Sequence, residues 1–188
     1  MKTEKQKMLA EEMYFPFDEE LTRDRERAKA LCFKLNQTCP TQRSVRAEVI
    51  RQLFSTSTDA WIESPFHCDY GYNISFGKGF YINHGCTLLD AAKISFGDNC
   101  LLAPNVVIST AGHPLDPIER ASGFEFAKAI TIGNDVWFGA NVTVCPGVNI
   151  GNNVVIGAGS VVNKNLPDNT VCVGVPAKPI KDLAENAK

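Results

Sequence analysis

The sequence predicts a mainly β fold, a parallel β-helix preceded by a small helical region. Two observations predict it: an apolar residue recurs about every six positions, and a very small residue, most often glycine, usually follows it. A six-residue period suits neither an α-helix nor a flat alternating strand, whereas short strands joined by tight corners sustain it. We expect the apolar residue to point into the coil and the glycine to let the chain turn. The residues that open the repeats are Phe76, Ile82, Leu88, Phe96, Leu102, Ile108, Ile132, Phe138, Val144, Ile150, Ile156 and Val162.

The fifth position of many repeats gives a second set of inward side chains. Two of the seven cysteines fall in this set, the total is odd, and no CxxC pair is present. Reduced core thiols are therefore a better interpretation than disulfides or a zinc site. The fifth positions are Cys86, Cys100, Val106, Val136, Val142, Val148 and Val154.

The repeat is interrupted twice. A small corner insertion separates Leu88 from Phe96, and the pattern disappears altogether over residues 110–129. A long loop that leaves a regular solenoid is typical of a functional segment.

The residues before the repeat predict helices. Lys2 to Met13 suggests a short helix, and Glu19 to Asn36 a longer one with Asp18 as its N-cap. Ser44 can cap a further helix, and Ser55 to Asp59 is the expected joint. We therefore divide the chain into a helical region (1–57), a β-helix with an inserted loop (58–177) and a closing cap (178–188), which we expect to be a short helix covering the exposed sheet edges.

Composition narrows the possible partners. The 188 residues are 44% hydrophobic and 21% charged, which is ordinary for a soluble protein, and the formal net charge of −2 implies no nucleic-acid surface. The first residues lack the apolar block of a signal peptide, and no stretch approaches the ~20 apolar residues of a membrane span. We expect a cytoplasmic protein without nucleic-acid or membrane partners.

Several segments together resemble the hexapeptide-repeat acyltransferases, and among them the maltose/galactoside O-acetyltransferases. They are MLAEEMYFPFDEELTRDRERAKAL, CDYGYNISFGKGFYINHGCTLLD, GDNCLLAPNVVISTAGHPLDPIER, ITIGNDVWFGANVTVCPGVNIGNNVVIGAGSVV and GVPAKPIK. The resemblance covers nearly the whole chain. It implies a left-handed β-helix, a homotrimer with active sites between subunits, and transfer of an acetyl group from acetyl-CoA to a sugar hydroxyl.

His113 and Asn83 are the expected catalytic residues. An attacking hydroxyl must lose its proton, and a histidine that titrates near about 6.5 can accept it at neutral pH. From the residues alone a solvated loop histidine is the commoner case, but His113 fills the position of the family's catalytic histidine. Asn83 matches an active-site asparagine and can donate to the acceptor or to the developing oxyanion.

Asp90 and Glu125 are the expected substrate-binding residues. Asp90 can accept hydrogen bonds from sugar hydroxyls, and Glu125 can orient either His113 or the sugar. Galactoside-type relatives carry a further Asp where this chain has Ala91, so the acceptor's identity stays open.

The resemblance places the cofactor in one groove of the solenoid. Small residues let a pantetheine chain approach the backbone, and flexible lysines meet phosphates as point charges. The expected acetyl-CoA residues are Trp137, Gly139, Ala140, Gly157, Ala158, Asn163, Lys164, Lys178 and Lys181.

Three alternatives remain at this point. The acceptor could instead be an antibiotic, a cell-surface saccharide or serine. A metal-dependent β-helix hydratase would need three histidines at subunit faces, whereas this chain has only His67, His84 and His113, with no close pair, so we expect no metal. A non-catalytic scaffold would have no use for His113, Asn83 and the groove together.

Overall fold

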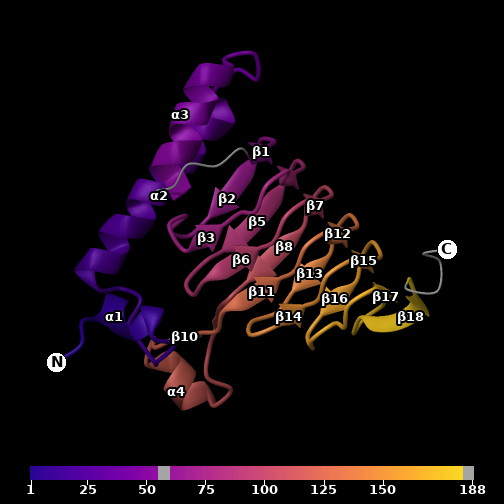
Figure 1. Cartoon of the computed structure of the whole chain (residues 1–188). Helices are drawn as coiled ribbons and strands as arrows, with labels where there is room; N and C mark the ends of the chain where they lie inside the picture. The colour runs from indigo at the N-terminus through magenta and orange to yellow at the C-terminus, as the bar shows by residue number, and fades with distance from the viewer. Residues whose placement is uncertain (55–59, 184–188) are drawn as a thin grey trace.

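The computed structural model describes residues 1–54 and 60–183, and these form a solenoid with helices at its N-terminal end (Figure 1). Three sheets make the sides of the solenoid, and successive coils add one parallel strand to each. The seven-stranded sheet contains β1 (Trp61–Ile62), β4 (Tyr81–Ile82), β7 (Leu101–Leu102), β12 (Trp137–Phe138), β15 (Val154–Ile156), β17 (Thr170–Val173) and β18 (Lys178–Asp182). The five-stranded sheet contains β2 (Phe66–Cys68), β5 (Cys86–Leu89), β8 (Val107–Ser109), β13 (Thr143–Val144) and β16 (Val161–Val162). The four-stranded sheet contains β3 (Ile74–Ser75), β6 (Ile94–Phe96), β11 (Ile130–Ile132) and β14 (Asn149–Ile150).

Register stacks like residues on like residues from coil to coil. In the four-stranded sheet, Ile132 pairs with Phe96 on one side and with Ile150 on the other. All the residues that open the repeats are buried except Phe76, which is partly buried against the same core, and every fifth-position residue is buried. The predicted parallel β-helix and both sets of inward residues are confirmed. Its left-handed sense stays a prediction.

The recurring glycines act differently from our prediction. Gly133 does not have a positive φ, but a Cβ added to it would lie 2.7 Å from the backbone of Gly151 in the next coil. These glycines therefore allow close stacking of coils. The turning itself falls to residues such as Asn99 and Asp135, whose φ is +58° in each case. Asn and Asp tolerate this left-handed conformation better than most residues do.

Three helices precede the solenoid: α1 (Glu4–Leu9), α2 (Glu19–Gln37) and α3 (Arg43–Phe54). Asp18 caps α2, as predicted, by accepting from the N–H groups of Glu20 and Leu21. Ser44 is not a cap. The third helix already begins at Arg43, because the carbonyl of Gln42 accepts from the N–H of Arg46 at 3.0 Å. The expected joint at Ser55 to Asp59 lies outside the described residues.

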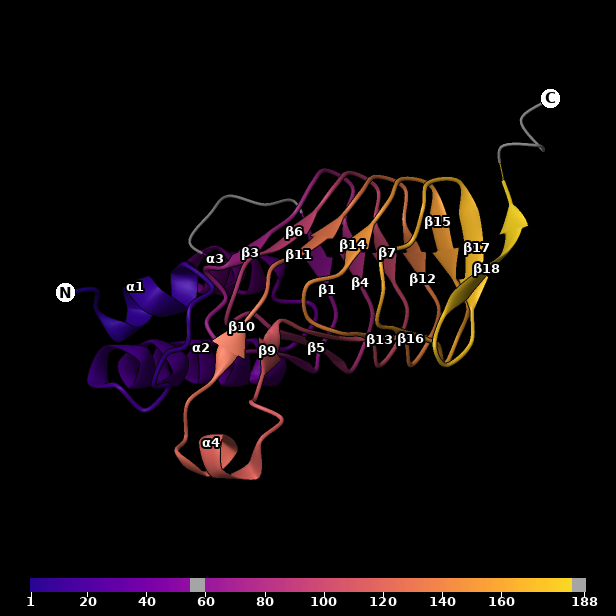
Figure 2. The same ribbon diagram turned by 90° about the horizontal axis from the view of Figure 1, so that it is seen from below.

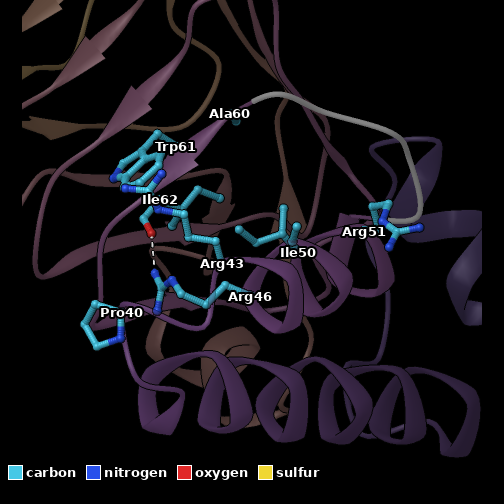
Figure 3. Close-up of a pocket in the computed structure, with 9 residues that line it drawn as sticks. Pro40, Arg43, Arg46, Ile50, Arg51, Ala60, Trp61 and Ile62 are labelled. Carbon is cyan, nitrogen blue, oxygen red and sulfur yellow. Dashed lines mark hydrogen bonds between the residues drawn. The ribbon is translucent and has the colours of Figure 1, made fainter.

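The long helices are fixed to the first coils by aromatic packing and by one buried arginine. Phe54 of α3 meets Phe66 at 5.9 Å and Phe76 at 4.9 Å between ring centroids. Arg46 donates to the carbonyls of Leu35 and Ile62 beside a cavity of about 320 Å³ between α3 and β1 (Figure 3). Since two backbone carbonyls occupy its guanidinium, Arg46 joins α2, α3 and the first coil.

The expected C-terminal helix is wrong over the described residues. Lys178–Asp182 is the strand β18, which runs antiparallel to β17. The physical reason is that the last coil leaves the edge of β17 unpaired, and the returning chain satisfies those backbone groups as a strand. Residues 184–188 of the expected helix lie outside the described part.

The inserted segment leaves the solenoid, as expected, and carries structure of its own. Strands β9 (Ala111–Gly112) and β10 (Phe126–Ala127) pair antiparallel, and α4 (Pro117–Ala121) lies between them. The carboxylate of Asp116 caps α4 by accepting from the N–H groups of Ile118 and Glu119. Figure 2 shows this hairpin and α4 projecting from the side of the solenoid. None of the helices in the described residues is long and apolar enough to cross a membrane.

Candidate active site

His113 follows β9 directly, at the point where the hairpin leaves the solenoid. Ala111 and Gly112 pair with Ala127 and Phe126, so the backbone before His113 is held by the returning strand. The imidazole is 54% exposed. The hairpin therefore fixes the backbone and leaves the side chain open to a ligand.

Glu125 comes back to His113 from the other arm of the hairpin. Its Oε1 lies 3.9 Å from His113 Nε2, and its Oε2 accepts a hydrogen bond of 2.9 Å from the hydroxyl of Tyr14. This distance is within ion-pair range but too long for a hydrogen bond. Glu125 therefore lies near enough to His113 to orient it, and whether it orients the imidazole or the sugar stays a prediction.

His113 and Glu125 line a cavity of about 260 Å³ between the hairpin, the N-terminal segment and the first coils. The polar part of the wall also contains two side chains that sequence analysis missed, Asp69 and Arg25. Burial raises the pKa of Asp69, and the nearby Arg25 partly offsets this. The other lining residues are Tyr14, Pro16, Phe17, Tyr70, Leu89, Ala91 and Ala111.

Arg25 reaches this cavity from α2, where it donates at 2.8 Å to the hydroxyl of Tyr70. Burial raises the pKa of Tyr70 to about 12, so its hydroxyl stays neutral near pH 7. No spacing rule links a helix residue, the residue after β2 and a loop histidine. The segments that carry Arg25 and Asp69 were singled out by resemblance, but nothing in the repeat marked the two residues themselves.

Asp90 is not a substrate-binding residue in this structure, which corrects our expectation. The residue is fully buried, and its Oδ1 accepts from the backbone N–H groups of Asp69 and Tyr70 while Oδ2 accepts from that of Asn73. Burial raises the pKa of Asp90 to about 7, although the backbone donors act in the opposite direction. Asp90 thus holds the turn that carries Asp69, and it cannot reach a sugar.

Asn83 lies apart from the His113 cavity within one chain. It follows β4 in the seven-stranded sheet, its Oδ1 accepts from the N–H of His84 at 2.8 Å, and it is half-buried. The two expected catalytic residues are therefore not brought together by a single chain.

Five of the expected cofactor residues, Trp137, Gly139, Ala140, Gly157 and Ala158, lie on two neighbouring coils. Trp137 is 52% exposed on β12, and the corner after it stacks on the corner of the next coil, where the N–H of Gly159 donates to the carbonyl of Ala140. A Cβ on Gly139 would lie 2.5 Å from the nitrogen of Ala158, and one on Gly157 would lie 2.6 Å from the Cγ1 of Val173. The absence of a side chain at Gly139 and Gly157 therefore lets neighbouring coils stack closely, with or without a ligand on the outer surface.

The polar cofactor candidates lie toward the C-terminal end of the solenoid. Asn163 and Lys164 follow β16, and Lys178 and Lys181 lie on β18. All four side chains are exposed. Charge for an anionic ligand is thus available at that end.

The histidines do not form a metal cluster in the parts of the chain that the structure describes. His84 approaches the carbonyl of Ser64 through Nδ1, and His67 is exposed on β2. Among the described residues, no three His, Cys, Asp or Glu side chains gather closely enough to hold a metal ion.

Two family models match the chain. The maltose acetyltransferase hexapeptide capping motif matches residues 7–57, and the bacterial transferase hexapeptide model, which covers six repeats, matches residues 129–164. The first match covers the N-terminal helices, and the second covers coils that follow the hairpin.

Solved structures resemble the chain over nearly its full length. A maltose O-acetyltransferase from Clostridium difficile 630 is 46% identical, with a TM-score of 0.95 and coverage of 97% of this chain and 98% of the other. A galactoside acetyltransferase in complex with coenzyme A is 38% identical, with a TM-score of 0.94 and coverage of 99% and 94%. A hexapeptide-repeat acetyltransferase from Vibrio cholerae O1, complexed with acetyl coenzyme A, is 34% identical, with a TM-score of 0.90 and coverage of 97% and 99%.

The family models and the similar structures together show that this chain is an enzyme of the acetyltransferase class. The chain belongs to the maltose/galactoside O-acetyltransferase family of hexapeptide-repeat acyltransferases.

Proposed function

We propose that this chain transfers an acetyl group from acetyl-CoA directly to a hydroxyl of a sugar of the maltose, glucose or galactoside type. The observation that carries the proposal is the His113 cavity, in which a partly exposed imidazole faces a carboxylate beside further hydrogen-bonding groups. Relatives with the same fold are a maltose O-acetyltransferase and a galactoside acetyltransferase.

His113 acts as the general base in this proposal. The acceptor oxygen attacks the thioester carbonyl and loses its proton to the imidazole, which returns that proton to the departing thiolate of coenzyme A. Glu125 stabilises the imidazolium between these steps. Asp69 and Glu125 can accept from sugar hydroxyls, and Arg25 can donate to sugar oxygens.

The cofactor occupies the groove beside Trp137, with its pantetheine arm along the corners at Gly139 and Gly157. Solved relatives contain coenzyme A and acetyl coenzyme A. Exposed Lys164, Lys178 and Lys181 supply positive charge for the phosphates.

We further propose a homotrimer whose active sites lie between subunits. Asn83 is separated from the His113 cavity in one chain, and a neighbouring subunit can bring its own Asn83 to the reacting carbonyl to stabilise the oxyanion.

The test is a thiol-release assay with acetyl-CoA and a panel of maltose, glucose, a galactoside, serine and a hydroxyl-bearing antibiotic, with His113→Ala as the matched blank. We expect release with at least one sugar, and product analysis should show an O-acetyl ester. Turnover with serine or the antibiotic alone would overturn the sugar assignment while keeping the acetyltransferase. Activity of His113→Ala equal to that of the wild type would remove the proposed base.

A further inference from the structure

The N-terminal segment pairs with the arm of the hairpin that carries Glu125. The N–H of Tyr14 donates to the carbonyl of Glu125 at 3.0 Å, and the N–H of Glu125 donates to the carbonyl of Tyr14 at 3.0 Å. The same two segments meet again where the Phe15 and Phe124 rings lie 5.7 Å apart and where the N–H of Ala129 donates to Glu11 at 3.2 Å. Residues 111 positions apart are thus held in a fixed register.

The side chain of Tyr14 fixes which carboxylate oxygen of Glu125 faces His113. Its hydroxyl donates to Oε2 at 2.9 Å, and Oε1 is then the oxygen that lies 3.9 Å from His113 Nε2. Burial, together with the Glu125 carboxylate, raises the pKa of Tyr14 well above its usual range. The hydroxyl therefore keeps its proton and remains a donor throughout the working pH range.

We infer that Tyr14 is a positioning residue for acetyl transfer, holding the Glu125 carboxylate in the rotation that faces His113. The inference rests on the proposed role of His113 and extends it to a residue outside the solenoid and the hairpin. The N-terminal segment then contributes to the reaction. Its pairing with the hairpin orders the Glu125 carboxylate before the acceptor binds, so the reaction itself does not include the cost of ordering that group.

Packing explains why an aromatic ring is buried at Tyr14, but it does not explain why that ring carries a hydroxyl. Tyr14 is 1% exposed, and its ring packs with Met8, Leu21 and Tyr70 in a cluster next to the solenoid. A phenylalanine would preserve this packing and remove only the donor to Glu125. Tyr14→Phe therefore separates positioning from stability.

The chain offers a matched control in Tyr72. Its ring packs against the same cluster, and its hydroxyl donates at 2.8 Å to Asp24 of α2, a different carboxylate from Glu125. Tyr72→Phe also loses one partly buried hydrogen bond to a carboxylate. It controls for any general loosening of the N-terminal segment.

The experiment measures kcat and both Michaelis constants for Tyr14→Phe, Glu125→Gln, the double variant and Tyr72→Phe, using whichever acceptor the panel identifies. Tyr14→Phe is expected to lower kcat about 10-fold to 100-fold and to leave the acetyl-CoA Michaelis constant unchanged. The double variant should be no slower than Glu125→Gln, because the hydroxyl acts only through that carboxylate. Tyr72→Phe should keep the wild-type kcat.

Two outcomes overturn the inference by itself: equal kcat values for Tyr14→Phe and Tyr72→Phe, or losses that multiply fully in the double variant. In either case an inactive His113→Ala leaves the proposed function standing. A fully active His113→Ala overturns the proposed base, and the role of Tyr14 with it. Melting temperatures of all variants show whether any loss of kcat reflects unfolding.

Discussion

The solenoid and the His113 site are built in opposite ways. In the solenoid, residues on successive coils repeat the same contact, as Ile132 does with Phe96 and Ile150. The site has no repeat: His113 and Glu125 come from the hairpin, Asp69 follows β2, and Arg25 comes from α2. Each of these side chains has different partners, so the place of one cannot be predicted from the place of another.

The solenoid therefore provides the stability of the molecule, whereas the proposed chemistry lies at the hairpin. Coils bury one continuous apolar core and tolerate no bulk where their backbones touch, as at Gly133. The hairpin instead projects from that core and leaves His113 half-exposed. A rigid solenoid that carries a projecting, polar site lets substitutions in one region be tested with little effect on the other.

The largest expected effect is on chemistry, from His113→Ala. In the proposed mechanism the imidazole moves the acceptor's proton, so its removal should lower kcat by about 10²–10⁴. Stability and the acetyl-CoA Michaelis constant should change little, because the side chain is largely open and does not hold the cofactor. Steady-state kinetics and a thermal melt measure these quantities, and a variant that keeps most of the wild-type turnover would remove His113 from the mechanism.

The next effect is on stability, from the same substitution made in each region. Ile132→Ala empties part of the core at a residue that is 2% exposed, and should lower the free energy of unfolding by about 2–5 kcal/mol. Ile118→Ala on α4 changes a residue that is 81% exposed, and should shift it by less than about 0.5 kcal/mol. Urea unfolding measures both. Equal losses would show that α4 is buried against another subunit, contrary to this division of roles.

A smaller effect is expected at Asp90, where the solenoid supports the site. An amide in Asp90→Asn would turn an NH₂ group toward backbone donors, which should cost about 1–3 kcal/mol of unfolding free energy. The folded-state pKa of Asp90 is raised to about 7, above its unfolded value of about 3.9, so its protonation stabilises the fold at low pH and this contribution is lost as pH rises to about 7.

The destabilisation by Asp90→Asn should accordingly be larger at pH 5 than at pH 8. Unfolding in urea at the two pH values measures the difference. Equal losses at the two pH values would show that Asp90 is already ionised in the folded protein at pH 5, so that the backbone donors outweigh its burial.

The sequence predicted the solenoid well because the physical rule of a coil repeats. The twelve residues that open the repeats all predict the same inward face. An irregularity at Phe76 or at the corner after Leu88 therefore does not change the predicted fold. The small helices were also found, since Asp18 and the stripe containing Leu35 are local signals. The prediction failed where one local pattern is compatible with two structures. A helix was expected from Lys178, but pairing with the open edge of β17 makes this segment a strand.

The site could be predicted only where one residue type carries the chemistry. His113 stands out by its residue type and its place in a loop. Asp69, Arg25 and Tyr14 instead meet the site through contacts between segments distant in the sequence, such as the 111 positions between Tyr14 and Glu125, which no local pattern predicts. Asp90 shows the converse error. A carboxylate at a corner looks like a sugar ligand until its three backbone donors are seen.

The smallest effects are expected from single lysines in the proposed cofactor groove. Lys164, Lys178 and Lys181 are exposed, so each contact with a phosphate is worth only about 0.2–1 kcal/mol, and salt screens it. Replacing all three by Ala should raise the Michaelis constant for acetyl-CoA severalfold, whereas the acceptor constant should hardly change. Lys29→Ala on α2 serves as a control distant in sequence from the groove.

Salt gives the more discriminating measurement for these lysines. Added salt should weaken acetyl-CoA binding by the wild type, and should weaken it less in the triple variant, which has already lost the screened charges. The kcat of both proteins should stay alike, because the phosphates of acetyl-CoA are far along the molecule from the thioester, where the proposed chemistry takes place. An unchanged acetyl-CoA constant together with an unchanged salt response would make these lysines ordinary surface charges. The cofactor's phosphates would then have to lie elsewhere, and the division between a binding solenoid and a catalytic hairpin would need to be redrawn.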